Sequence, residues 1–330
     1  MYKAHSGMPY KGWIAICASA ALVIPWSLVH AGKAIHELRN ADPQGEVEII
    51  NVSGTVVVDA WNRNEVEVSG TVGDNVERVD VTGAGNRTSV HVLSRSAHSW
   101  NSDNEADLVI HVPAKSMVSA TLVNADLKIT GVSGDLKLQT VSGNIVGDAG
   151  GDVRATTVSG NVKLTAHAAK ATEIRTISGD IQLKGGGGEV DLTTVSGTAT
   201  IELADVSRAR FKSISGDMSA TLTLLPEGQM ESESVSGNVK LSFGNEPSAE
   251  FDVQSFSGDI KNCFGPKPIE SRYGPGSRLQ FKNGEGHAHV RINTKSGDVK
   301  LCAKGMRETH ESALSLARLT DTRVVVPYVY

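Results

Sequence analysis

One short phrase recurs along this chain and constrains its fold more than any other feature. The phrase runs Thr/Ser/Gln, Val/Ile/Phe, Ser, Gly, Asn/Asp, an aliphatic residue, any residue and Leu, with small departures in single copies. A repeated unit can bury its apolar face only against its neighbours, so the phrase indicates a stacked architecture. The serines and glycines of the nine copies are Ser133, Gly134, Ser142, Gly143, Ser159, Gly160, Ser178, Gly179, Ser196, Gly197, Ser215, Gly216, Ser236, Gly237, Ser257, Gly258, Ser296 and Gly297.

The spacing of the copies predicts two short units in each turn. Most steps between neighbouring serines are 17 to 21 residues, whereas the step from Ser133 to Ser142 is only 9. Residues 123–129 form a degenerate copy 9 residues before Ser133. The basic unit is therefore about 9 residues long, and a turn of about 19 residues contains two strands and two corners.

The residues around each Ser-Gly pair predict strands joined by corners. Apolar and polar residues alternate after the pair, and successive side chains on a strand point to opposite faces. Gly accepts positive φ, and Asn or Asp bonds to nearby backbone groups, so Ser-Gly-Asn/Asp fits a corner. We expect inward side chains at Leu136, Leu138, Val162, Leu164, Ile181, Leu183, Val239, Leu241, Val299 and Leu301, outward ones at Lys137, Lys163, Gln182, Lys240 and Lys300, and one more stacked apolar column at Val132, Val141, Val158, Ile177, Val195, Ile214, Val235 and Phe256.

Together these patterns predict an all-β fold, a single-domain β-solenoid of stacked two-strand turns with an N-terminal β cap. Aromatic residues make up 5% of the chain, which fits a thin core of Val, Ile and Leu. The alternative is a β-sandwich with accidental Ser-Gly turns, which nine in-phase copies disfavour.

The start of the chain predicts export. Residues 1–31 have a basic beginning, an apolar stretch over 13–29 and a Val-His-Ala ending that fits the cleavage rule, so the mature chain would begin at Gly32. An uncleaved signal anchor stays open, because the apolar stretch approaches the length that spans a bilayer. Cys17 follows an isoleucine, where a lipoprotein signal needs a small residue.

The rest of the chain divides by its patterns into four further segments. Residues 32–44 are expected to be a linker. Residues 45–120 are β-rich but aperiodic, and we expect them to cap the open end of the stack, because unpaired strand edges must be covered. The repeat domain covers 121–302, and the tail 303–330 has the pattern of a short helix near 308–319 followed by a closing strand.

Two cysteines, Cys263 and Cys302, follow the signal, and each lies six residues after a repeat serine. An exported chain with two thiols favours a disulfide. If residues 257–296 make one long turn, the cysteines stack about 4.8 Å apart, within the range that a disulfide permits. If those residues make two turns, the gap is about twice as wide and the thiols stay free.

Other motifs suggest chemistry only weakly, and we expect no catalytic, metal or cofactor-binding residues. His287 and His289 share a strand face but have no evident third ligand, so a metal site is disfavoured. The glycines of 184–189 lack the Gly-Lys-Ser/Thr ending of a phosphate loop, and 147–152 lacks the order of a calcium-binding nonapeptide. The column Asp135, Asn144, Asn161, Asp180, Asp217, Asn238, Asp259 and Asp298 is explained by corner hydrogen bonds without a ligand.

The phrase also resembles a known family. Residues 257–265 (Ser-Gly-Asp-Ile-Lys-Asn-Cys-Phe-Gly) and 296–302 (Ser-Gly-Asp-Val-Lys-Leu-Cys) are similar to the bacterial β-strand-repeat family of unknown function that is often labelled "putative adhesin". The resemblance covers roughly residues 45–302. It implies a binding role and supplies no catalytic residues.

The charge of the chain bears on its partners. Loss of Lys3 and Lys11 with the signal leaves 30 basic and 37 acidic residues, and this acidic balance argues against nucleic acid as a partner. We therefore expect an exported, non-enzymatic binding or scaffold protein of the cell envelope, whose partner is an envelope protein or a glycan. With 28 residues after Cys302 and no sorting signal, the periplasm is favoured over the cell surface.

Two other functions stay open. A β-helix polysaccharide lyase or hydrolase would use longer turns, clustered acids and bases, and aromatic sugar platforms, whereas the repeat has short turns and no Trp. A self-assembling filament would need open ends, against which the expected cap argues.

Overall fold

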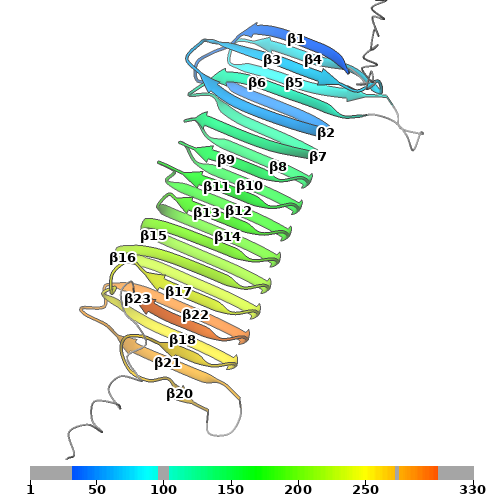
Figure 1. Ribbon diagram of the computed structural model, residues 1–330. Coiled ribbons are helices and arrows are strands. Elements are labelled where there is room, and N and C mark those ends of the chain that lie inside the picture. Colours follow the sequence, from blue (N-terminus) through cyan, green and yellow to red (C-terminus); the bar gives the residue numbers. More distant parts are fainter. Residues whose placement is uncertain (1–31, 96–103, 272–274, 304–330) are drawn as a thin grey trace, which may run out of the picture. The chain divides into compact units, whose positions relative to one another are not determined.

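Every regular element in the described part of the chain is a β-strand. The computed structural model describes residues 32–95, 104–271 and 275–303 (Figure 1). The first strands are β1 (Lys33–Asn40), β2 (Glu46–Trp61), β3 (Glu65–Val72), β4 (Val76–Ala84), β5 (Arg87–Ser94), β6 (Ala106–Pro113), β7 (Met117–Val132), β8 (Leu136–Ser142), β9 (Ile145–Ala149), β10 (Val153–Ser159), β11 (Val162–Ala166) and β12 (Ala171–Ser178). They are followed by β13 (Ile181–Gly185), β14 (Gly188–Ser196), β15 (Ala199–Ser215), β16 (Met218–Ser236), β17 (Val239–Phe243), β18 (Ala249–Ser257), β19 (Ile260–Asn262), β20 (Ile269–Glu270), β21 (Ser277–Lys282), β22 (Ala288–Ser296) and β23 (Val299–Ala303). Within the described ranges no helix has the length and hydropathy needed to span a bilayer.

The strands stack in two parallel ladders, which we call face A and face B. Face A contains β8, β10, β12, β14, the second halves of β15 and β16, β22 and β18, paired in that order. Face B contains β9, β11, β13, the first halves of β15 and β16, β17, β23 and β19. Each turn passes from face A through a Ser-Gly corner to face B, and through a second corner to the next turn. This arrangement confirms the predicted all-β solenoid.

The side chains between the two faces form the core. All ten predicted inward residues are buried, including Leu138 and Leu241 with no exposed surface. The outward lysines Lys137, Lys163 and Lys240 are exposed. Strict alternation along each strand thus places one set of residues inside and the next in solvent.

The apolar column before each serine lies mostly on the outer surface, a direction that the sequence prediction left open. The column exists, but seven of its eight members lie on the outer surface, from Val195 at 36% exposed to Phe256 at 70%. The reason is that alternation continues up to the corner: Thr140 is buried, so Val141 must point outward. Val132 is buried because Ser133 belongs to the opposite corner, where Val132 pairs with Ala149.

The N-terminal part differs from the predicted division in two places. Residues 33–40, expected in a linker, form β1, which pairs antiparallel with β3. The boundary at 120/121 falls inside β7, which pairs with β2 over both faces, so β2 is already a full turn of the stack. Beyond β2 lie β5 with its antiparallel partner β4 on one face, and β6 with antiparallel β3 on the other.

The C-terminal turns do not stack in the order of the sequence. The turn of β22 and β23 lies between the turn of β16 and β17 and the turn of β18 and β19, parallel to both. In Figure 1 the orange β22 accordingly lies between yellow-green and yellow strands. Antiparallel β21 then pairs with β18, and β20 with β21. We call residues 288–303 the inserted turn.

Three predictions concern parts of the chain outside the described residues. They are the signal over 1–31, the short helix near 308–319 and the closing strand that follows it.

Candidate functional site

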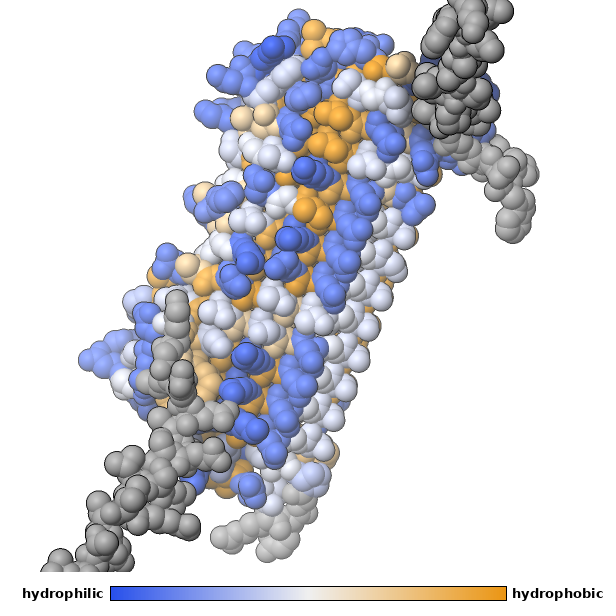
Figure 2. All heavy atoms as spheres, in the orientation of Figure 1, coloured by the Kyte–Doolittle hydropathy of each residue, from blue (hydrophilic) through white to orange (hydrophobic). Residues whose placement is uncertain are grey.

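The Ser-Gly corners stack on one another and form a continuous edge. Ser142, Ser159, Ser178, Ser196, Ser215, Ser236, Ser296 and Ser257 pair in that order and are all exposed. Figure 2 shows a row of pale, near-neutral residues along one margin of the stack. Ser133 is not part of this edge, because it lies at the opposite corner, where its hydroxyl donates to the carbonyl of Ala114 at 2.8 Å.

Glycine is required on this edge because successive turns approach closely there. A Cβ on Gly197 would meet the carbonyl oxygen of Gly179, and one on Gly216 would meet that of Gly197. Gly197 also has a φ of 132°, which side chains rarely allow. The edge can therefore present only the side chains that flank the glycines.

The Asn and Asp residues after the glycines link one turn to the next. The amide of Asn161 donates to Oδ1 of Asn144 at 3.1 Å, the amide of Asp180 to Asn161 at 2.9 Å, and the amide of Thr198 to Asp180 at 2.8 Å. Further along, Asn238, Asp298 and Asp259 continue the series from Asp217. These side chains therefore serve the corner hydrogen bonds between turns, and Asp135 does the same at the opposite corner.

The exposed apolar column is the most unusual surface of the edge, and we call it the valine stripe. Each member lies between two residues that pair with their equivalents in the neighbouring strands, so the side chains stack at successive levels. In spatial order the stripe contains Val52, Val123, Val141, Val158, Ile177, Val195, Ile214, Val235, Lys295 and Phe256. Its apolar members are between 36% and 70% exposed. A contiguous apolar surface of this kind is typical of interaction sites.

The histidines and glycines of the other motifs lie beside acids or at a corner. His287 lies 3.2 Å from Glu285, and His289 lies 3.7 Å from Glu250. In the part of the chain that the structure describes, no group of three His, Cys, Asp or Glu could hold a metal ion. The glycines at 185, 186 and 188 have positive φ at the corner between β13 and β14.

The acids of the weak calcium-like motif are engaged by the backbone. Oδ2 of Asp148 accepts from the amide of Gly131 at 3.0 Å, and Oδ1 of Asp152 accepts from the amides of Lys170 and Ala171. Both side chains therefore serve the corner opposite the Ser-Gly edge.

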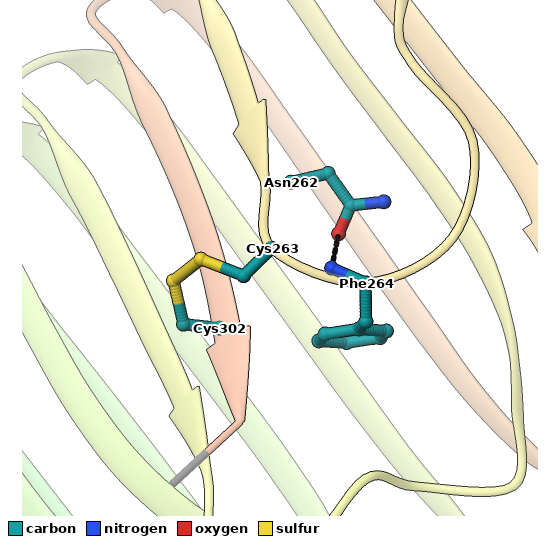
Figure 3. The surroundings of a disulfide bond; sticks show 4 residues. All are labelled: Asn262, Cys263, Phe264 and Cys302. Carbon is teal, nitrogen blue, oxygen red and sulfur yellow. Dashed lines mark hydrogen bonds between the residues drawn. A yellow bond between two sulfur atoms is a disulfide. The ribbon is translucent and has the colours of Figure 1, made fainter. Parts of the chain in front are cut away.

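Cys263 and Cys302 form a disulfide in the structure, with their Cα atoms 4.9 Å apart (Figure 3). The pairing of β19 with β23 brings them together, and the amide of Cys263 donates to the carbonyl of Leu301 at 2.9 Å. Beside the bridge, Oδ1 of Asn262 accepts from the amide of Phe264 at 3.3 Å. Residues 257–296 thus make one long turn, the first of the two geometries considered above.

A charged cleft of about 660 Å³ crosses β15, β16, β22, β18 and β21. Two arginines that line it form ion pairs: Arg210 lies 3.8 Å from Glu231, which also lines the cleft, and 3.2 Å from Asp191 outside it. Arg208 lies 3.2 Å from Glu189, which is also outside the cleft. Ion pairs between neighbouring strands explain these residues as part of the ladder. The sequence pattern does not predict this cleft, because the cleft depends on the position of the inserted turn.

The phrase, its corners and the two-faced stack agree with one known family over most of the chain. Residues 46–302 match the family described as Toastrack DUF4097. The chain belongs to the Toastrack DUF4097 family. This confirms the predicted membership of a bacterial family of unknown function. No match was found among curated proteins.

Solved structures similar to this Toastrack chain have differing names. A "putative adhesin" from Bacteroides fragilis is 12% identical, with 82% of this chain and 97% of that chain covered and a TM-score of 0.42. A "putative adhesin" from Parabacteroides distasonis is 14% identical, with 82% and 97% covered and a TM-score of 0.43. A "putative lipid binding protein" from Parabacteroides distasonis is 11% identical, with 81% and 97% covered and a TM-score of 0.36. Because these TM-scores are low, the similarities do not indicate an activity for this chain.

Proposed function

We propose that this Toastrack protein is an exported, non-enzymatic binding or scaffold protein of the bacterial cell envelope, adhesin-like, which acts in the periplasm. The observation that carries the proposal is the valine stripe. It exposes apolar side chains at successive levels of the stack, although alternation along the same strands buries the neighbouring positions. Exposed apolar surface on an exported protein favours a partner that covers it.

A polysaccharide lyase or hydrolase on the same fold has less support. Such an enzyme would need free acids and bases beside aromatic platforms. The acids of the Ser-Gly edge instead accept backbone hydrogen bonds, as Asp180 and Asp217 illustrate. Both tryptophans after residue 31, Trp61 and Trp100, precede the repeat domain. These features favour binding over catalysis.

Protease shaving of intact cells, compared with the isolated periplasm, tests the location. We expect the protein to be protected on intact cells, and mass spectrometry of the periplasmic form to show a mature chain that begins at Gly32. Cleavage on intact cells would place the protein on the surface. Recovery of the whole chain from the cytoplasm would contradict the export proposal.

Cross-linking in cells tests the binding role and its surface. The stripe variant Val158→Lys, Ile177→Lys, Val195→Lys puts three charges on the stripe. The matched control Thr165→Lys, Thr200→Lys, Thr221→Lys puts the same charges on outward positions of face B. We expect the stripe variant to lose cross-linked partners that the control keeps. Equal patterns in both variants would contradict the proposal that the stripe binds.

A further inference from the structure

A two-fold axis can set the valine stripe against the same stripe of a second copy of the chain. Eight of the ten levels of the valine stripe run from β8 to β18, and their midpoint lies between β14 and β15. The other two levels, Val123 on β7 and Val52 on β2, continue the stripe beyond β8. A two-fold axis through that midpoint, in the plane of contact and parallel to the strands, would set the stripe of one copy against that of a second copy, running in opposite directions. Such an interface is self-complementary, as a two-fold dimer requires.

We propose that the partner of the valine stripe is a second copy of this chain, packed face A to face A in this antiparallel arrangement. The inference rests on the proposed function, in which the stripe is a binding surface. It names the occupant of that surface.

The area of the stripe is sufficient for a specific contact. Seven of the eight levels present apolar side chains, and the eighth presents Lys295, whose stem can cover an apolar neighbour. The seven leave on the order of 600 Å² exposed on each copy, so a dimer would bury about 1,200 Å², the lower limit of specific interfaces. A dimer of moderate affinity is therefore expected.

The columns beside the stripe also match under this symmetry. On one side the exposed serines would face serines, and a hydroxyl can both donate and accept a hydrogen bond. On the other side, three levels separate Arg175 from Glu233. Within one copy Arg175 pairs with Glu173 at 2.7 Å and Glu233 pairs with Lys212 at 3.0 Å. The two-fold axis sets Arg175 of one copy opposite Glu233 of the second copy, so this column would add an attraction of opposite charges between the copies.

The outward residues four positions before each stripe residue form the next column, and their charges sum to zero. Under the same axis Lys137 would face Asp252, and Asp191 would face Arg210. The remaining two pairs are alike in charge, with Arg154 opposite Arg291 and Glu173 opposite Glu231. Attraction and repulsion balance in this column, so the stripe and the Arg175 column decide the register.

Engineered disulfides test this register on the full mature protein. Val141 and Phe256 lie seven levels apart in one copy, about 34 Å, so they cannot bridge within a chain. The antiparallel dimer sets them opposite each other. We expect Val141→Cys with Phe256→Cys to form a covalent dimer on a non-reducing gel, and each single variant to stay monomeric. A covalent dimer of Val141→Cys alone would show a parallel arrangement and overturn the proposal.

Sedimentation across a concentration series tests the association itself. We expect a dimer whose dissociation constant rises at least tenfold in the Val158→Lys, Ile177→Lys, Val195→Lys variant and is unchanged in the face B control. Arg175→Glu should weaken the dimer about two- to fivefold, and Glu233→Arg in addition should restore it. Circular dichroism checks that each variant keeps its fold.

The outcomes separate this inference from the proposed function. A protein that is monomeric at about 100 μM, far above the dissociation constants of most specific complexes, overturns the dimer. If that monomer still loses envelope cross-links in the stripe variant, the binding role stands with another partner. If the dimer forms but no envelope partner is cross-linked, the stripe serves self-association alone.

Discussion

At the scale of single residues, close approach between turns governs the Ser-Gly edge. At Gly197 a side chain would have to share space with the carbonyl oxygen of Gly179 one turn away. Gly85 makes a useful contrast, because its φ is also positive, at 67°, but nothing lies within 4 Å of its missing Cβ. The two positions separate steric contact from backbone strain.

We expect Gly197→Ala to lower the free energy of unfolding by more than about 3 kcal/mol, because the turns must separate locally to admit the methyl group. Gly85→Ala should cost about 1 kcal/mol, from backbone strain alone. Chemical denaturation of both variants measures the difference. Equal losses would show that backbone strain, and not contact between turns, explains the corner glycines.

The hydrogen bonds between corners lead to a second prediction. In Asn161→Ala the amide of Asp180 loses its acceptor, and stability should fall by about 1 kcal/mol. Thr198→Ala is the matched control, because the bond at that level uses the backbone amide and its acceptor on Asp180 remains. The control should stay within about 0.5 kcal/mol of the parent protein. If Thr198→Ala lowers the free energy of unfolding as much as Asn161→Ala does, the loss comes from changing any corner residue and not from this hydrogen bond.

The sequence predicted the corners but not the surface they create. Ser-Gly-Asn/Asp identified the turns correctly, since Gly and Asn/Asp have distinctive backbone chemistry. It did not show that the Asn and Asp side chains reach the next turn, because such bonds join residues far apart in the sequence, from 17 positions between Asn144 and Asn161 to 60 between Asn238 and Asp298. The exposure of Val141 was missed although alternation from Leu138 through Thr140 already contained it.

At the scale of elements, the disulfide joins the inserted turn to its neighbour. The bridge between Cys263 and Cys302 closes a loop with a sequence separation of 39. It does so across β19 and β23, the outermost pair of face B. The stability of the C-terminal levels therefore depends on the redox state of the compartment.

We expect purified mature protein to contain this bridge, and Cys263→Ser with Cys302→Ser to lower the free energy of unfolding by about 3–4 kcal/mol. Denaturation with and without reductant measures the effect. Reductant should destabilise the parent protein and leave the double variant unchanged. A parent protein that does not respond to reductant, or that has two free thiols by mass spectrometry, would contradict the prediction.

The inserted turn itself was beyond prediction from sequence. All copies of the phrase have the same register, so Ser236 can pair equally well with Ser257 or with Ser296. The structure selects Ser296. Repeats specify how neighbouring turns align and do not specify which turns are neighbours.

At the scale of the whole described stack, that equivalence gives a prediction about refolding. Consider two chains in the cysteine-free background, one ending at residue 287 and one at residue 303. The shorter chain lacks β22 and β23, so β18 can pair directly with β16 through Ser257 and Ser236. We expect it to refold without a slow step that the longer chain shows, because only the longer chain must place a late turn between two others.

Stopped-flow refolding from denaturant measures both chains. Circular dichroism of the shorter chain shows whether its strands form. The same slow phase in both chains would contradict the prediction, because it would show that insertion of residues 288–303 does not limit folding.

The position of the inserted turn has a consequence for the export that we propose, in which the chain crosses the membrane N-terminus first. Levels as far as β17 can join the growing stack as soon as they cross the membrane. The level that stacks next on β17 is the inserted turn, residues 288–303, which has not yet crossed the membrane at that stage. In the sequence it follows β19 only after the 25 residues that separate Asn262 from Ala288. The C-terminal end can therefore close only when residue 303 has been delivered. The fold is therefore complete only after translocation has reached residue 303. The Cys263–Cys302 disulfide then links the last two turns covalently.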